Sequence, residues 1–451
     1  MEGRIMGQIT LDEAPLNSFH KRVVAFTTGG MFCDGYILGM IGYAMVLLGP
    51  QMNLTPFWYG MIGSSALIGI FIGSLLCGWL TDRIGRKLAF TIDLILMLVL
   101  SISQFFVTDP TQLFIVRLLL GIAIGAEYAI GAALMAEFLP KKQRGSLLAC
   151  LNAVWTLGFV VSVIAGYFML KMGGDTIWRW MLASSSIPAF IVLILRWGAP
   201  ESPRWLINKG RREEAENIVK KYIGSNVVID DLVIEENVKT SYLELFSKKY
   251  MKRTIFCSVF WFCQITPFFA IITFAPQILK TFNLSDDGLT GTLILNLFQL
   301  AGVIFGVWIM DKVSRRYFMI VSFAILIPSL FILGIIPNPS AFILILCFAV
   351  FLFVVTAAGN LEYVYPSELF PTHIRSTGVG FASAMSRTGA AVGTLLLPMG
   401  IERYGIGVTL LIGAGVLVIG LITSILLAPE TRGLSLNEAS LVLDQTANNK
   451  I

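Results

Sequence analysis

Five ionisable side chains stand inside long apolar stretches of this chain, where a charge is costly to keep. They are Asp34, Arg117, Glu127, Glu362 and Arg387. A charged group at the centre of a membrane helix costs at least about 2.5–3.5 kcal/mol, so it usually marks a functional site. A carboxylate in such a place can load and release a proton, and an arginine, which stays charged, can bind an anion. These residue types predict proton movement and anion binding.

Asp34, which stands two residues before Tyr36, is the best candidate for a proton carrier. A dry cavity favours its protonated form and a nearby arginine favours its charged form, so a change of surroundings can load and unload it. The alternative is a structural salt bridge that never titrates. Glu127 is either a second proton site or a group that orients Arg117, and we favour the orienting role. Asp93 lies too near the end of its segment to count among these residues.

Arg387 and Glu362 concern a bound solute. The planar guanidinium of an arginine suits a carboxylate, so Arg387 predicts an anionic solute. The alternative is that Arg387 pairs only with Glu362 of the neighbouring segment. In a combined version, Glu362 leaves Arg387 when an acidic solute arrives.

The elements that must position these residues are membrane helices. Of the 451 residues, 56% are hydrophobic and 14% are charged, whereas a soluble protein carries roughly 25% charge. The apolar residues form blocks long enough to span a bilayer, which takes about 20 residues. Twelve segments are predicted, at 22–48, 57–80, 88–107, 112–136, 146–170, 180–198, 254–279, 290–310, 317–336, 342–365, 376–399 and 406–428.

The segments fall into two groups of six around one long polar stretch. We expect an N-terminal bundle, a cytoplasmic linker with short helices, a C-terminal bundle and a cytoplasmic tail, at 1–198, 199–253, 254–428 and 429–451. Most Lys and Arg residues then lie on one side, which predicts that both termini are cytoplasmic. The lipid bilayer is therefore the expected partner of these cations. Their position explains the net charge of +5, and no nucleic acid partner is expected. The 6 cysteines and 2 histidines have no metal-site spacing, so no metal is expected.

A cationic turn follows the second and the eighth segment, which indicates a duplicated chain. The turns run from Gly78 to Lys87 and from Asp311 to Arg316. We expect their charges to form a cytoplasmic gate that joins the halves in one conformation and releases them in another. The simpler alternative is a topology anchor made of positive charge. The gate residues expected here are Asp82, Arg83, Gly85, Arg86, Asp311, Arg315 and Arg316.

Two acid–base pairs stand at matching places in the halves. Glu137 precedes Arg144 by seven residues, and Glu368 precedes Arg375 by the same interval. Isolated surface pairs contribute less than about 1 kcal/mol, but the repeated spacing favours a network with the cationic turns. Both pairs are therefore included in the expected gate.

Six sequence features together resemble the major facilitator superfamily, in its sugar-porter and metabolite–proton symporter branches. They cover nearly the whole chain: the cationic turn 78–87, Arg117 with Gly121 and Gly125, Glu137-Phe138-Leu139-Pro140 with Arg144, Pro200–Leu206, Ser367–Pro371 with Arg375, and Pro429–Gly433. The resemblance implies the major facilitator fold, an all-α membrane protein of two six-helix bundles that alternately opens to each side. In the related xylose–proton symporters a helix-1 aspartate pairs with a helix-4 arginine, which implies the pair Asp34 and Arg117.

The chain departs from the sugar pattern around the expected solute site. Helix 7 holds a single glutamine, Gln264, and helix 10 has Glu362-Tyr363 in place of a Pro-Trp pair. Few amides and many aromatic side chains favour a flat or charged solute over a hexose, because unfilled buried polar groups cost about 1–3 kcal/mol each. Besides Arg387 and Glu362, the expected solute contacts are Gln264, Asn152, Asn296, Gln299, Tyr36, Trp155, Phe268 and Tyr363.

The sequence therefore predicts a proton-coupled symporter that imports a small organic acid by alternating access, in a prokaryotic plasma membrane. We expect a monomer that uses the proton as coupling ion and needs no cofactor. A sugar or polyol symporter or uniporter is the alternative within the class, and a transporter-like nutrient sensor is the alternative outside it. A membrane enzyme is not expected, because the spans offer no nucleophile–base pair and no metal ligands.

Overall fold

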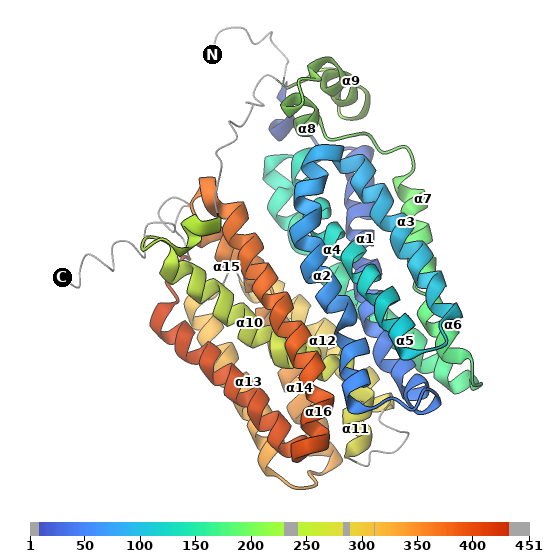
Figure 1. Cartoon of the computed structure of the whole chain (residues 1–451). Coiled ribbons are helices and arrows are strands. Elements are labelled where there is room, and N and C mark those ends of the chain that lie inside the picture. The colour runs from blue at the N-terminus through green and yellow to red at the C-terminus, as the bar shows by residue number, and fades with distance from the viewer. Residues whose placement is uncertain (1–8, 230–241, 283–288, 311, 433–451) are drawn as a thin grey trace, which may run out of the picture.

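The computed structural model describes residues 9–229, 242–282, 289–310 and 312–432. Figure 1 shows two helical bundles side by side, the first half of the chain in one and the second half in the other. The expected all-α membrane architecture is confirmed. The first bundle contains α1 (Ser18–Gln51), α2 (Pro56–Ile84), α3 (Arg86–Ser103), α4 (Pro110–Phe138), α5 (Lys141–Met172), α6 (Ile177–Ala183) and α7 (Ser186–Arg196).

The second bundle repeats this plan. It contains α10 (Met251–Thr273), α11 (Ala275–Thr281), α12 (Leu289–Met310), α13 (Arg315–Ile335), α14 (Ala341–Ala358), α15 (Leu361–Leu369) and α16 (Thr372–Leu427). Its last helix, α16, is 56 residues long, which at 1.5 Å per residue is about 84 Å, more than twice the thickness of a bilayer core. Gly405, with φ +80°, breaks it. The eleven apolar stretches of the described chain therefore make twelve spans, because the last one folds back at this glycine.

Three of the expected spans are interrupted along their length. The sixth breaks between α6 and α7, the seventh at Phe274 between α10 and α11, and the tenth at Gly359-Asn360 between α14 and α15. Hydropathy predicted each as one continuous helix. Broken helices expose backbone polar groups at mid-depth, and transporters place their sites at such points.

The linker has two parts. A 3₁₀ helix (Tyr242–Phe246) packs against α10 and α16 of the second bundle. The other part forms a small unit on the first bundle and contains α8 (Pro203–Asn208), α9 (Arg212–Tyr222) and strand β2 (Val227–Val228), which pairs in parallel with β1 (Ile9–Thr10). A separate apolar cluster that includes Leu206, Val219 and Val227 forms the core of this unit. The Asn17 side-chain amide donates to the carbonyl oxygens of Tyr222 and Ile223, at 2.8 and 3.1 Å, and so joins this unit to the start of α1.

Several close contacts between described residues of the two bundles lie on the side away from the cationic turns. There, the Tyr43 hydroxyl donates to the Leu289 carbonyl at 3.1 Å, and the Gln277 amide donates to the Gly42 carbonyl at 3.2 Å. A side chain at Gly60 of α2 would come within 2.2 Å of the Leu395 carbonyl oxygen of α16. We call the opposite side, which carries the turns at 83–87 and 312–316, the cation-rich face.

Candidate substrate and proton site

A cavity of about 430 Å³ lies between the bundles, which is within the usual size range of small-molecule sites. It is bounded by α1, α4 and α5 of the first bundle and by α10, α12, α14, α15 and α16 of the second. Met310 and Ser367, near the ends of α12 and α15, line it. The cavity thus extends toward the cation-rich face.

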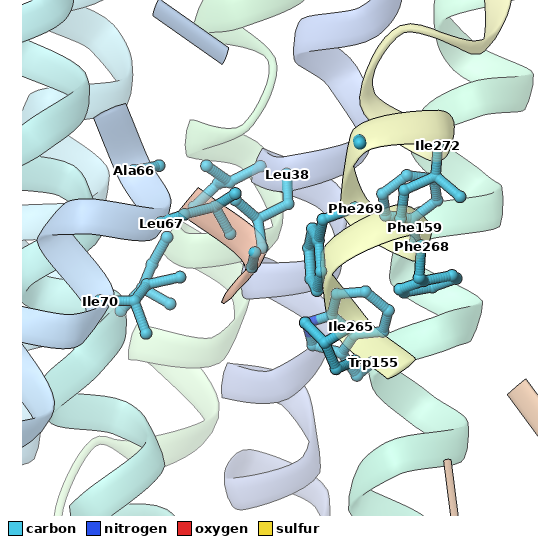
Figure 2. Close-up of a cluster of buried hydrophobic side chains, with 14 of the residues drawn as sticks. Leu38, Ala66, Leu67, Ile70, Trp155, Phe159, Ile265, Phe268, Phe269 and Ile272 are labelled. Carbon is cyan, nitrogen blue, oxygen red and sulfur yellow. The ribbon is translucent and has the colours of Figure 1, made fainter. Parts of the chain in front are cut away.

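Aromatic side chains from both bundles form much of the cavity wall. Trp155 of α5 and Phe269 of α10 meet edge to face with ring centroids 6.1 Å apart. Figure 2 shows Trp155, Ile265, Phe268 and Phe269 gathered at this contact. Such a wall suits a flat apolar solute, and a few polar groups then fix its orientation.

Asp34 is fully buried at the base of this wall. Its Oδ2 accepts hydrogen bonds from the Tyr128 hydroxyl and from the Trp155 Nε1, the latter at 2.6 Å. Its Oδ1 has no partner among the described groups. A carboxylate held by two donors, with one oxygen left over, has room to accept a proton without losing its position.

Arg387 connects Asp34 to the second bundle. The Arg387 guanidinium of α16 lies 4.6 Å from the centre of the Tyr128 ring, in cation–π contact. Tyr128 in turn donates to Asp34. Arg387 also acts electrostatically on both Asp34 and Glu362, so one cation is shared by two carboxyl groups. Both Arg387 and Glu362 line the cavity.

The expected pairing of Asp34 with Arg117 is wrong in this conformation. Arg117 is fully buried, and its Nη1 donates to the Gln104 amide oxygen at 3.4 Å. The glycine pattern that follows Arg117 serves packing instead: a side chain at Gly121 would come within 2.1 Å of the Ala66 carbonyl oxygen of α2. Arg117 thus faces another part of the first bundle.

Glu127 does not orient Arg117 either. Its carboxyl group meets that of Asp93 of α3, and Arg196 of α7 acts on both. Asp93, which we expected to lie too near the end of its segment to count among the buried charges, lies within α3 and is 2% exposed, so leaving it out was wrong.

The cavity contains about half of the solute contacts expected from the sequence. Asn152, Trp155, Phe268, Glu362 and Arg387 line it. Four others are absent from the lining. The Gln264 amide donates to the Val355 carbonyl, and the Asn296 amide donates to the Thr292 carbonyl. The Tyr36 hydroxyl forms a hydrogen bond with the Ser184 hydroxyl, and Gln299 is buried. The Tyr363 side chain lies outside the described residues.

Asn360 is the main lining residue that the sequence reasoning missed. The Asn152 amide nitrogen of the first bundle donates to the Asn360 amide oxygen of the second at 3.4 Å. Asn360 follows Gly359 at the break between α14 and α15. A Gly-Asn pair inside an apolar run is a breaker signal and was available to find it. Tyr128, Thr156 and Thr356 also line the cavity and were not expected.

At the cation-rich face of the first bundle, a charge cluster joins three helix ends. Arg86 Nη2 lies 3.5 Å from Glu137 Oε1. Glu201 Oε1 accepts from the backbone N–H groups of Arg86 and Lys87 at 2.9 and 3.1 Å, a favourable position for a carboxylate at a helix start. Gly85 has φ +99°, and a side chain there would come within 2.4 Å of Glu201 Oε2. Only glycine fits this turn.

The second bundle carries a matching cluster. Arg315 Nη2 lies 3.7 Å from Glu368 Oε1, and Glu430 Oε1 accepts from the backbone N–H of Arg315 at 3.2 Å. Burial acts to raise the pKa of Glu430, but hydrogen bonds from Ser314 and from backbone N–H groups outweigh it and hold that pKa below its usual value. The expected pair of Glu368 with Arg375 is wrong, since Arg375 Nε donates to the Phe370 carbonyl at 3.1 Å.

The other gate residues expected from the sequence are Arg83, Arg316, Asp82, Arg144 and Asp311. Arg83 and Arg316 are exposed, and Arg316 Nη2 donates to the Ile425 carbonyl at 2.9 Å. The side chains of Asp82 and Arg144, and the whole of Asp311, lie outside the described residues. Each cluster ties together helices of its own bundle in this conformation.

Two bundles around a shared central cavity, with charged residues buried beside it, define a membrane transporter of the alternating-access class. The chain belongs to the sugar (and other) transporter family, whose model matches residues 22–443. It is 45% identical over 95% of its length to the inner membrane metabolite transport protein YgcS of Escherichia coli, of which the match covers 95%. It is 26% identical over 96% of its length to the niacin transporter NiaP of Acinetobacter baylyi, with 99% of that protein covered.

The fold is that of the major facilitator superfamily. A structure of the xylose transporter XylE from E. coli superposes with a TM-score of 0.79 at 23% identity, covering 93% of this chain and 100% of that one. The chain is thus a multi-pass membrane transporter of small metabolites and not an enzyme. Its bacterial relatives, one of them named an inner membrane protein, agree with a prokaryotic plasma membrane.

Proposed function

We propose that this transporter is a proton-coupled symporter that imports a small organic acid anion, with the cation-rich face in the cytoplasm. The observation that carries the proposal is the connection from Arg387 through Tyr128 to Asp34 across the two bundles. This connection supports the proposal because it links a permanent cation that lines the cavity to a buried carboxylate, which is the kind of group that can bind a proton.

The order of events follows from charge. With the cavity empty, Arg387 faces the carboxylates of Asp34 and Glu362. An arriving carboxylate competes with them for the guanidinium, and Asp34, with less positive charge nearby, then binds a proton more readily. Rocking of the bundles exposes Asp34 to the other side, where the proton and the anion leave. The aromatic wall and the name of the niacin transporter NiaP support a flat, carboxylate-bearing solute.

Proteoliposomes with an imposed pH gradient test the proposal. Nicotinate and nicotinamide serve as matched probes, because they have nearly the same shape and differ in charge. We expect the gradient to drive uptake of the acid by the wild-type protein. In Asp34→Asn, uphill uptake should be abolished while counterflow exchange persists, because exchange needs no net proton movement.

Two results would overturn the proposal. Intact accumulation in Asp34→Asn would exclude this residue as the proton site. Uptake that is indifferent to the gradient and to protonophores in the wild type would exclude proton coupling, and a preference for neutral sugars over acids in the same vesicles would favour the sugar or polyol alternative.

A further inference from the structure

Asp93 of α3 and Glu127 of α4 form a buried carboxyl pair inside the first bundle, apart from the cavity lining. They are 2% and 0% exposed, and the two carboxyl groups are close enough to hydrogen-bond to each other. Apart from an interaction of the Leu94 backbone N–H with Asp93, no described group donates a hydrogen bond to their four oxygens. Two carboxylates with so few donors would repel each other in a medium of low dielectric constant.

The surroundings hold the pair in place without neutralising it. A side chain at Gly30 of α1 would come within 2.1 Å of Glu127 Oε1, so this carboxyl group lies directly against the backbone of α1. The Thr27 hydroxyl, one turn earlier and fully buried, has no described partner. The charged or titratable groups that act on the pair from neighbouring helices are Cys33 and Asp34 of α1 and Arg196 of α7.

Arg196 is the one cation among these groups, and it is itself incompletely satisfied. It is 3% exposed, its guanidinium lies 3.6 Å from the centre of the Phe90 ring, and its Nη2 donates to the carbonyl oxygens of Arg86 and Lys87 at 3.4 and 3.3 Å. Its Nε and Nη1 have no partner among the described groups. One cation balances one carboxylate, so the second carboxyl group needs another positive charge.

We propose that Asp93 and Glu127 share one proton and form a second proton-binding site between Asp34 and the cation-rich face. A proton on one carboxyl group donates to the other, which satisfies two of the orphaned oxygens and leaves a single negative charge opposite Arg196. A metal ion fits less well, because Arg196 already supplies positive charge and the described residues contain no group of three metal ligands.

The site lies on a route out of the cavity. Tyr128, the residue after Glu127, donates to Asp34, and Cys33, the residue before Asp34, faces all three carboxyl groups. At the other end, Arg196 binds the backbone of Arg86 and Lys87, the same residues whose N–H groups bind Glu201. A proton released by Asp34 thus has an acceptor on the way to the cation-rich face.

Infrared spectroscopy of the full-length protein in liposomes tests the shared proton directly. The probe is the C=O stretch of a protonated carboxyl group at neutral pH, measured in the Asp34→Asn/Glu362→Gln background so that neither carboxyl group beside the cavity contributes. We expect the band in that background, and its complete loss in both Glu127→Gln and Asp93→Asn, because the new amide donates to the remaining carboxylate and replaces the proton.

The contrary outcomes are distinct. Absence of the band before substitution means that the pair holds no proton and overturns the proposal. Alternatively, each single substitution halves the band, and only the double variant abolishes it. This result means that each carboxyl group is protonated independently, and it overturns the proposal of a shared proton. Neither reading depends on transport activity.

A transport measurement then tests the role of the site, and this part rests on the proposed proton coupling. One coupled proton supports up to about tenfold accumulation for a gradient of about one pH unit. In Glu127→Gln, with Asp34 intact, we expect that accumulation to be lost while counterflow exchange is preserved. Accumulation equal to wild type would show that the pair does not take part in coupling. Failure of the wild type to respond to the gradient would instead refute the proposed function and leave the infrared result standing.

Discussion

The two bundles are alike at the cation-rich face and unlike inside. Each face cluster contains an arginine at a helix start, a glutamate at the end of a neighbouring helix, and a glutamate after the last helix of the bundle: Arg86, Glu137 and Glu201 in one, and Arg315, Glu368 and Glu430 in the other. The described interior of the first bundle, by contrast, holds the buried carboxylates Asp34, Asp93 and Glu127.

In the second bundle, the buried charges beside the cavity are Arg387 and Glu362. The comparison indicates that both halves of the duplicated chain kept the charge cluster at the face, whereas their buried charged residues differ. We assign proton handling to the first bundle and anion recognition to the second, and four experiments can break or sharpen that division.

The largest effect is expected from Arg387→Gln. Hydrogen bonds to charged groups contribute about 1.5–3 kcal/mol, so binding of an anionic solute should weaken about 10- to 150-fold. Binding of nicotinamide should change much less than binding of nicotinate, as measured by competition in counterflow exchange. An equal loss for both probes would show that Arg387 only pairs with Glu362.

Gly60→Ala tests where the bundles meet. The new methyl group would lie against the Leu395 carbonyl of the other bundle, and overpacking costs about 1–3 kcal/mol. The conformation described here should therefore lose about 5- to 150-fold in population. Labelling at Ser367→Cys, measured by mass spectrometry at that position, should slow accordingly.

Gly73→Ala is the matched control for this experiment. A side chain at Gly73 would also come within 2.2 Å of a backbone oxygen, that of Ile122, but inside the first bundle. It should lower the melting temperature and leave the labelling rate unchanged. The same slowing in both variants would mean that the labelling rate follows overall damage instead of the contact between the bundles.

Arg86→Gln and Arg315→Gln test whether the two face clusters are equivalent. Both arginine side chains are mostly buried, at 16% and 12% exposed. Each loss of a charge-assisted bond should destabilise the protein by about 2 kcal/mol, seen as similar falls in the melting temperature. A fall in only one of the two variants would show that the clusters have diverged like the interior.

The smallest effect concerns Glu430, whose pKa is held below its usual value. A carboxyl group with a lowered folded-state pKa stabilises the fold above its unfolded-state pKa, and this contribution is lost as pH falls through the folded-state pKa. Wild type should therefore melt above Glu430→Gln at neutral pH, and the difference should vanish in acid, below the usual glutamate range. A difference that grows in acid would contradict the assigned hydrogen bonds.

The number and order of the spans could be predicted from hydropathy, but their interruptions could not. The breaks at Phe274 and at Gly359-Asn360 occupy one or two residues inside apolar runs, so an average over about 20 residues passes over them. Gly405 is the opposite case: the gap between the last two expected segments was visible in the sequence, and its glycine supplies the whole turn.

Asp34, Arg117, Glu127, Glu362 and Arg387 could be predicted from the sequence as buried charges, but their partners could not. Asp34 and Arg117 both lie in spans, and sequence gives only the approximate depth and not the face that each presents. Asp93 and Arg196 are buried because α1, α3, α4 and α7 pack together, and that packing is tertiary information. Glu201 and Glu430 belong to two of the sequence features that resemble the family. Their matching positions after the sixth and twelfth spans also indicate that the same charge cluster occurs in both halves.

The hydrogen bonds from Asn17 to Tyr222 and Ile223 have a consequence for biosynthesis. The partners are 205 and 206 positions apart in the chain, and chains fold from the N-terminus as they emerge. Asn17 caps the first membrane helix, yet it meets its own acceptors only after all six helices of the leading half have been made. The linker can therefore dock on Asn17 only after the first half has been synthesised, and it can do so before the second half enters the bilayer.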